Sequence, residues 1–218
     1  AVIDRSTTQY VSSSPNYAFD VDSPSVLTVP PTYSNVEPYI PPGRYEGWAR
    51  SNNAIDLNVT SLTVQVSAYD RPVSLTGIDV VEYESLPAIT GYALSAPTGD
   101  GTAIDYENID INLDEQTVTV DASITEGEIT ARGLSQNNTP EIVRPVNFPG
   151  FEIPPNNQMW FSLYARASEQ SAAWKIRLSL IVDGDQYNQV LAGPDGGPFV
   201  TRSGRHEDLE YIRFDGEK

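Results

Sequence analysis

The stretch WKIRLSLIVDGDQYNQVLAGPDGGPF, residues 174–199, decides the fold. Apolar side chains alternate with other residues from position 174 to 182, which is typical of a strand with one buried face. Asp183-Gly184 follows, and this dipeptide supplies the positive φ angles of a type I′ turn. The next strand, residues 186–191, therefore folds back antiparallel, and the two strands form a core hairpin.

The glycine- and proline-rich run at 193–198 turns the chain before Phe199 returns to the core. Upstream, residues 159–164 (MWFSLY) form another apolar strand, and the short connection 165–173 separates it from the hairpin. Because strands that follow one another closely usually pair, we expect these three to form a meander. The sequence ASEQSAA within the connection is the nearest approach to a helical pattern, sufficient for one helical turn.

Short runs rich in β-branched and aromatic residues recur along the chain. They lie at 57–68, 73–83, 105–113, 117–124 and 209–214. No segment of ten or more residues carries a sustained helical stripe with caps. We therefore predict a mainly β fold, an antiparallel β-sandwich of the jelly-roll or Ig-like kind, because the strands follow one another at the turn spacing of such folds.

Residues 1–45 form a Pro/Tyr-rich N-terminal extension that also contains many serines. Proline removes a ladder donor and pushes its predecessor into extended conformations, so we expect irregular backbone with at most short edge strands, such as 25–29. Tyrosines in this segment favour contact with a folded surface over full solvation. We predict a stalk or wrapping segment at 1–45 and a single β-sandwich domain at 46–218.

Composition narrows the classes of partner. The chain has 218 residues and no cysteine, so its stability comes from packing and sheet hydrogen bonds rather than from disulfides. A net charge of −17 repels nucleic-acid phosphates and anionic lipid surfaces, and nucleic acid is not an expected partner. The acidity is typical of a soluble protein, and it also fits cation binding, a basic partner or a saline habitat.

The sequence contains no run of about 18 apolar residues that would span a membrane. It begins AVIDRSTT, without a methionine, which indicates a processed protein or a fragment. We expect a membrane anchor upstream of residue 1.

Catalytic motifs are weak. His206 is the only histidine, and no G-x-S-x-G elbow accompanies it, so we expect a solvated histidine rather than a member of a triad. Acidic residues at 105, 107, 110 and 114 mostly alternate with apolar ones, as on the solvent face of a strand. Abundant carboxylates still permit a glycosidase pair.

No cofactor is expected, with structural calcium as an alternative. Asp100, Asp105 and Glu107 are the candidate ligands, although the D-x-[DN]-x-[DN]-G loop is missing. With no cysteine and one histidine, the usual zinc sites cannot be assembled.

Tryptophan and tyrosine rings are candidates for an aromatic ligand platform, because flat rings stack on apolar ligand surfaces. We expect Trp160 and Trp174 to pack in the core, and Trp48, Tyr92 and Tyr106 to be the ligand-binding candidates. The loops 86–104 and 133–158 and the edge near Trp48 are the expected ligand face, because binding residues tend to lie on long loops. On this hypothesis, Trp48→Ala weakens ligand capture with little loss of stability.

The sequence LTVQVSAYDRPVSLTGIDVVEYES at 62–85 and the ending W-x-I-x-L…D-G…G-x-P-F at 174–199 resemble a group of uncharacterised actinobacterial proteins. Members of that group carry one transmembrane helix followed by an extracytoplasmic β domain. The resemblance covers about residues 54–204. It implies a membrane-tethered, extracytoplasmic location and no activity, so no functional residue is carried over.

Together these observations predict a non-enzymatic, extracytoplasmic binding ectodomain of a membrane-anchored bacterial protein. The expected partner is an envelope protein or a wall polysaccharide, and the expected state is a monomer. Two alternatives stay open. One is a glycan-active hydrolase that uses a carboxylate pair, and the other is a structural component of a virion or surface layer, where jelly-roll sandwiches also serve.

Overall fold

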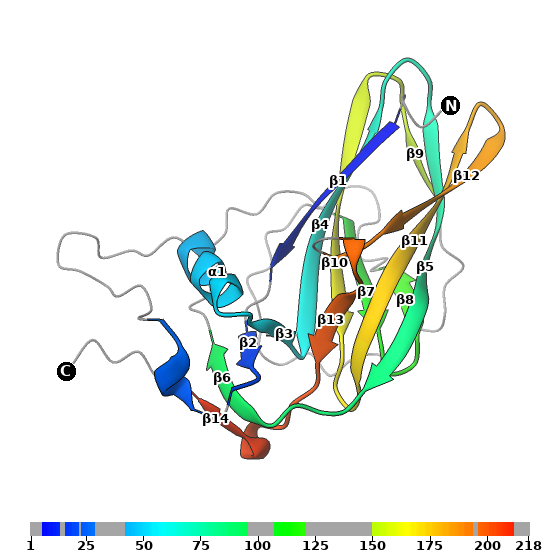
Figure 1. Cartoon of the computed structure of the whole chain (residues 1–218). Helices are drawn as coiled ribbons and strands as arrows, with labels where there is room; N and C mark the ends of the chain where they lie inside the picture. The colour runs from blue at the N-terminus through cyan, green and yellow to red at the C-terminus, as the bar shows by residue number, and fades with distance from the viewer. Residues whose placement is uncertain are drawn as a thin grey trace, which may run out of the picture.

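A computed structural model describes residues 6–13, 16–21, 23–28, 42–95, 107–120, 150–193 and 196–211. These residues form mainly strands, one α-helix and two short 3-10 helices (Figure 1). The elements are β1 (Ser6–Ser13), β2 (Asn16–Phe19), η2 (Pro24–Val26), α1 (Pro42–Ser51), β3 (Ile55–Leu57), β4 (Val59–Ala68), β5 (Val73–Leu86), β6 (Gly91–Ser95), β7 (Glu107–Asn112), β8 (Thr117–Val120), β9 (Phe151–Ile153), β10 (Asn157–Arg166), β11 (Ser171–Val182), β12 (Asp185–Leu191), β13 (Phe199–Arg202), η4 (His206–Asp208) and β14 (Leu209–Tyr211).

The strands form two sheets, and the predicted mainly β fold is confirmed. Sheet A has the order β1-β4-β10-β7-β8, and sheet B has the order β14-β6-β2-β3-β13-β11-β5-β9, with β12 also paired to β11. Most pairings are antiparallel, as expected. Three of them, β10 with β7, β13 with β3 and β14 with β6, are parallel, so both sheets are mixed.

The main core lies between the inner faces of the two sheets. Burial alternates strictly along β4 and along most of β11, because successive side chains of a strand point to opposite faces. One cluster of buried side chains therefore draws on both sheets. It includes Leu62, Val64, Phe161 and Leu163 from sheet A and Leu75, Trp174, Ile176 and Leu178 from sheet B. Face-to-face packing of this kind is the arrangement of a β-sandwich.

The hairpin formed by β11 and β12 follows the sequence prediction. Asp183 and Gly184 have φ angles of 55° and 85°, as a type I′ turn requires, and the two strands pair antiparallel from Val182 with Asp185 onward. Phe199 is buried and its ring centroid lies 5.0 Å from that of Trp174. The turn before it brings Gly193 so close to the Pro198 carbonyl that a Cβ would lie 2.7 Å from the oxygen.

The predicted meander is wrong. β10 pairs with β4 and β7 in sheet A, whereas β11 pairs with β5, β12 and β13 in sheet B. Residues 167–170 carry the chain from one sheet to the other and form no helical turn. Both strands bury an apolar face against the opposite sheet, and that packing outweighs the preference of consecutive strands to pair.

Asp114 stabilises this crossing between the sheets. Its carboxylate accepts hydrogen bonds from the backbone N–H groups of Ser168, Glu169 and Gln170, at 2.9–3.3 Å. The turn that presents Asp114 is itself closed by Asn112, whose Oδ1 accepts from the backbone N–H of Asp114 at 3.0 Å. A carboxylate that we expected on a solvent face thus joins the β7–β8 turn to the β10–β11 connection.

Residues 1–45 contribute strands to both sheets. β1 pairs with β4 over its whole length, and β2 lies between β3 and β6 with Tyr17, Ala18 and Phe19 buried. β1 is an edge strand of sheet A, which the prediction allowed, whereas the interior strand β2 was not expected. Residues 24–26, within the expected edge strand, form a 3-10 helix, and residues 29–41 lie outside the described part.

The helix α1 was not expected from the sequence. It begins at Pro42, a residue favoured at the first helical position, and it is followed by Asn53 with a φ of 58°, the left-handed conformation that commonly ends a helix. Trp48 and Ala49 bury one side of α1 against β2 and β6. Tertiary packing of these two side chains, rather than a long apolar stripe, holds the helix in place.

We expect Asp114→Asn to lower the free energy of unfolding by about 2 kcal/mol, because it weakens hydrogen bonds from three backbone donors to a charged acceptor. Urea denaturation followed by tryptophan fluorescence measures the change. Glu115→Gln is the matched control, since Glu115 is the exposed neighbouring carboxylate. Equal stability of the two variants would contradict a structural role for Asp114.

Candidate functional site

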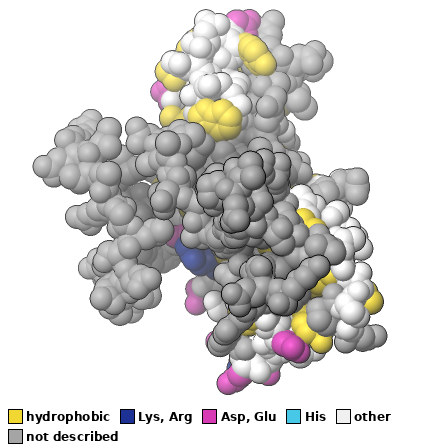
Figure 2. All heavy atoms as spheres, turned by 90° about the vertical axis from the view of Figure 1, so that its left-hand side faces the viewer, with side chains coloured by type: hydrophobic (Ala, Val, Ile, Leu, Met, Phe, Trp, Pro, Cys, Tyr) yellow, Lys and Arg dark blue, Asp and Glu magenta, His cyan; other side chains and the backbone are white. Residues whose placement is uncertain are grey.

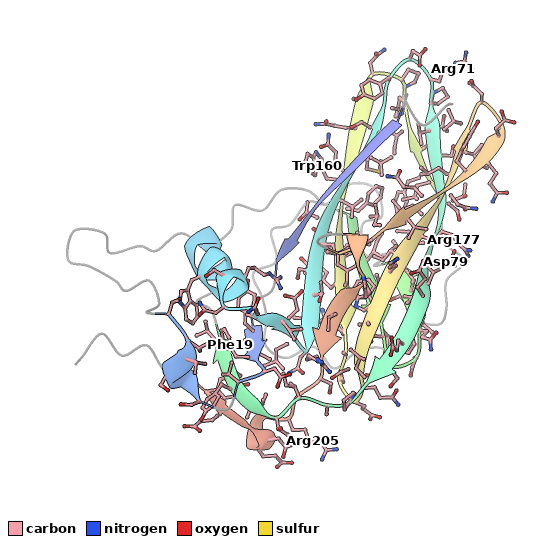
Figure 3. The ribbon with its side chains drawn as sticks, viewed as in Figure 1. Phe19, Arg71, Asp79, Trp160, Arg177 and Arg205 are labelled. Carbon is pink, nitrogen blue, oxygen red and sulfur yellow. The ribbon has the colours of Figure 1, made fainter. Side chains whose placement is uncertain are left out.

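Trp48 does not lie on the surface, and the expectation that its ring is an exposed ligand platform is wrong. It is 9% exposed and its ring centroid lies 5.5 Å from that of Phe19. The indole Nε1 donates a hydrogen bond to the Thr28 carbonyl at 3.1 Å. Trp48 therefore anchors α1 on β2, with Phe19 shown beneath the helix in Figure 3.

The other candidate residues do not form one described site. Tyr92 lies in β6, half-buried against the cluster that contains Trp48, so these two of the described candidates come together. Tyr106, Asp100 and Asp105 lie outside the described residues. Glu107 begins β7 and His206 begins η4. Of the two loops expected to carry the ligand face, residues 91–95 form β6 and residues 151–153 form β9.

A buried polar network joins α1 to the main core. Arg50 Nη2 lies 2.5 Å from Asp56 Oδ1, and Thr60 Oγ1 donates to Asp56 Oδ2 at 2.8 Å. Because each hydroxyl has a single proton, Thr201 donates to Thr60 across their 2.7 Å contact and accepts from Trp174 Nε1 at 3.0 Å. The donors of this chain of hydrogen bonds thus all lead to the Asp56 carboxylate. This carboxylate joins α1 to the core, and its role is structural.

Burial raises the pKa of Asp56 above its usual value of 3.8. The residue is 3% exposed, and removal from water penalises the charged carboxylate. The Arg50 charge and the hydrogen bonds from Thr60 and Arg50 act in the opposite direction and offset part of this effect.

Several other described carboxylates form ion pairs with basic side chains at the surface. Asp79 and Arg177 are 3.0 Å apart on the outer face of sheet B, where both are labelled in Figure 3. Glu82, which has a φ of 50° at a bulge opposite Trp174, lies 2.6 Å from Lys175. Within the described ranges, no group of three or more Asp, Glu or His side chains is placed to hold a metal ion.

The outer face of sheet A carries two aromatic side chains that the sequence analysis did not select as ligand candidates. Phe161, Leu163 and Ala165 of β10 point into the core, so Trp160 and Tyr164 point outward and are partly exposed. Trp174 is fully buried as expected, whereas the core position expected for Trp160 is wrong. Figure 3 shows Trp160 projecting away from the sheet on the side of β1 and β4.

Uncharged polar residues neighbour these rings. Trp160 is opposite Gln65 on β4, and Tyr164 is opposite Ser61. The amide of Gln65 donates to Ser67 Oγ and to Gln158 Oε1. We call the outward side chains of Trp160, Tyr164, Gln65, Ser61, Ser67, Gln158, Asn108 and Asp110 the aromatic face. Figure 2 views the molecule from this side, and its upper part shows hydrophobic side chains beside a few acidic ones.

Beside Tyr164, Arg166 and Asp110 form an ion pair. Arg166 Nε donates to Asp110 Oδ1 at 3.0 Å, and the guanidinium carbon of Arg166 lies 5.9 Å from the centre of the Tyr164 ring. The charges of Arg166 and Asp110 compensate each other. The aromatic face therefore offers rings, amides and hydroxyls at low local net charge, although the chain as a whole is strongly acidic.

No protein-family model, curated protein or solved structure matches this chain. The resemblance to actinobacterial membrane-anchored proteins stays a prediction.

Among the described helices, none is both long and apolar enough to cross a membrane.

Trp48→Ala should lower the free energy of unfolding by about 3 kcal/mol, because it leaves a cavity between α1 and β2. Trp160→Ala is the control for loss of an indole. Because the Trp160 ring is partly exposed, its removal should lower the free energy of unfolding by less. Chemical denaturation of both variants gives the comparison, and a Trp48→Ala protein as stable as the wild type would mean that α1 is not held by this ring.

The stability contributed by protonated Asp56 is fully present below pH 3.8 and is lost as the pH rises through the higher pKa of the folded state. Relative to Asp56→Asn, the wild type should therefore lose stability across that window. Thr60→Val removes a hydrogen bond that lowers the pKa of Asp56, so the window should extend to higher pH. Thermal unfolding at a series of pH values tests both, and parallel curves for wild type and Asp56→Asn would rule out the effect.

Proposed function

We propose that this chain is a non-enzymatic binding module that recognises a polysaccharide outside the cytoplasm through the aromatic face. The observation that supports this proposal is the outward position of Trp160 and Tyr164 on the same strand. Their Cα atoms are separated by roughly 13 Å, since a strand rises about 3.3 Å per residue. A linear chain of several sugar units spans that distance.

The chemistry of the aromatic face suits sugars. An indole or phenol ring stacks on the apolar C–H surface of a sugar ring at little cost in side-chain entropy. Amides such as Gln65 and Gln158 and hydroxyls such as Ser61 and Ser67 donate to and accept from sugar hydroxyl groups. A sheet also holds these groups on a rigid backbone, which reduces the entropy lost on binding.

Local charge favours a neutral ligand over a basic protein. In the aromatic face the only carboxylate is Asp110, which is paired with Arg166. A basic partner would instead be drawn to the acidic surface elsewhere on a chain of net charge −17. We therefore favour a wall polysaccharide over an envelope protein as the partner, in a tethered module such as the resemblance to actinobacterial proteins implies.

The glycan-active hydrolase is less favoured. Asp56, Asp79, Asp110 and Asp114 are each engaged by a cation or by backbone donors, and these contacts give them structural roles.

Trp160→Ala should weaken polysaccharide binding about tenfold, because it removes a stacking contact of about 1.4 kcal/mol. The measurement is the bound fraction at increasing protein concentration on chitin, cellulose, xylan and purified wall polysaccharide of an actinobacterium. Tyr69→Ala is the matched control, since Tyr69 is an aromatic residue, 47% exposed, in the turn between β4 and β5.

Capture by none of these polysaccharides, with the protein folded, would overturn the proposal. Equal binding by wild type and Trp160→Ala would place the site elsewhere.

A further inference from the structure

One buried hydroxyl group differs from the other buried polar groups of the described chain. The buried polar or charged residues are Asp56, Thr60, Ser162, Ser171, Thr201 and Ser203. All of them except Ser162 have a side chain that makes a hydrogen bond to another residue. Within the ranges that the structure describes, Ser162 Oγ has no hydrogen-bond partner. Because buried polar groups in proteins are nearly always hydrogen-bonded, this hydroxyl needs a partner from outside the chain, such as water or a ligand.

Ser162 lies at the centre of the aromatic face. β10 is the middle strand of sheet A. Ser162 is two residues after Trp160 and two before Tyr164, so the three side chains point to the same outer surface. Across the neighbouring strands, Ser162 is opposite Thr63 on β4 and Asn108 on β7. Its neighbours along the strand face the core, so the 7% of Ser162 that remains exposed is on the outer surface.

The size of these side chains restricts what can reach the hydroxyl. Serine is short, whereas the Trp160 and Tyr164 rings on either side extend further from the backbone. A ligand that contacts all three residues must therefore lie along β10, with its outer units near the rings and a central unit above Ser162. The exposed part of Ser162 is too small to contact a whole amide group, but a single hydroxyl can reach its Oγ.

We propose that Ser162 determines the specificity of the aromatic face, and that the ligand is a linear neutral glycan whose central sugar unit presents a free hydroxyl group to Ser162 Oγ. This inference rests on the proposed polysaccharide function and adds the chemical class of the sugar. A glycan of unsubstituted sugars, such as a xylan or a β-glucan, carries only hydroxyl groups on its rings. In chitin an acetamido group replaces one hydroxyl on every unit, and this bulkier group fits poorly above Ser162.

The hydroxyl is well suited to such a contact. Ser162 Oγ can donate one hydrogen bond and accept others, as a sugar hydroxyl can. Since the side chain is already nearly buried, it loses little further hydration when a ligand covers it. Its position on the middle strand of a sheet also holds it in place before binding, which reduces the entropy lost. Thr63 and Asn108 place a second hydroxyl and an amide on the adjacent strands.

The charges around Ser162 favour a neutral glycan over an anionic one. Ser162, Thr63 and Asn108 are uncharged, so this row of the sheet offers no cation to a uronate or a phosphate group. Arg166 lies further along β10, and its charge is compensated by Asp110 at 3.0 Å. The net charge of −17 on the whole chain would also repel an anionic glycan.

Isothermal titration calorimetry of the whole chain with xylohexaose, cellohexaose and chitohexaose tests the proposal. The wild type should bind at least one of the two unsubstituted hexasaccharides about tenfold more tightly than chitohexaose, because the acetamido groups are excluded above Ser162. Ser162→Ala should weaken that binding about fivefold, the ratio that corresponds to one net hydrogen bond.

Thermal unfolding separates this role from a structural one. Ser162→Ala should leave the unfolding temperature unchanged, since its Oγ bonds to no other residue of the described chain. Ser162→Val is a second variant, which keeps a residue favoured in strands but covers the site with methyl groups, so it should weaken binding by more than Ser162→Ala. Ser74→Ala is the matched control, because Ser74 is an outward serine on β5 in the other sheet, and it should bind as the wild type does.

Two results would overturn the proposal directly. One is chitohexaose bound as tightly as both unsubstituted hexasaccharides, and the other is Ser162→Ala with the affinity of the wild type. If binding is lost in Trp160→Ala but unchanged in Ser162→Ala, the aromatic face stands and this role of Ser162 is wrong. Binding to none of the three hexasaccharides would overturn the sugar class, and capture on wall polysaccharide would then show separately whether the proposed function holds.

Discussion

The structure depends on the burial of two opposed apolar faces, and Trp174 lies at the centre of that packing. Its side chain is fully buried, its ring packs against Phe199, and its Nε1 hydrogen-bonds to Thr201. From Thr201 the polar network runs through Thr60 to Asp56 and Arg50. A single indole therefore links the apolar core to α1, the one α-helix among the described residues, because its nitrogen needs a partner that the surrounding hydrocarbon cannot supply.

The same inward packing determines what the outer surfaces carry. Since side chains alternate along a strand, burying Phe161 and Leu163 places Trp160 and Tyr164 on the outer face of sheet A. Likewise, burying Leu191 and the body of Tyr187 places Asn188 and Val190 on the outer face of sheet B.

Much of the fold could be predicted from local pattern, whereas the candidate site could not. The alternation from Trp174 to Val182 and the Asp183-Gly184 turn specify their hairpin within a few residues, and they do so correctly. The run MWFSLY is different, because five of its six residues are bulky and largely apolar, and such a run does not reveal which of them point inward. Trp48 was misplaced for a related reason: its burial depends on Phe19, and the two residues are distant in sequence.

The sequence by itself determined the mainly β class, the β11–β12 hairpin and the strongly acidic surface, since these follow from composition, alternation and turn chemistry over short distances. Only the tertiary structure decided that β10 and β11 lie in different sheets, that β1 and β2 belong to the fold, and that Trp160 rather than Trp48 is partly exposed. The physical reason is that strand pairing and the choice of buried face depend on contacts between residues far apart in sequence. Local propensity does not record those contacts.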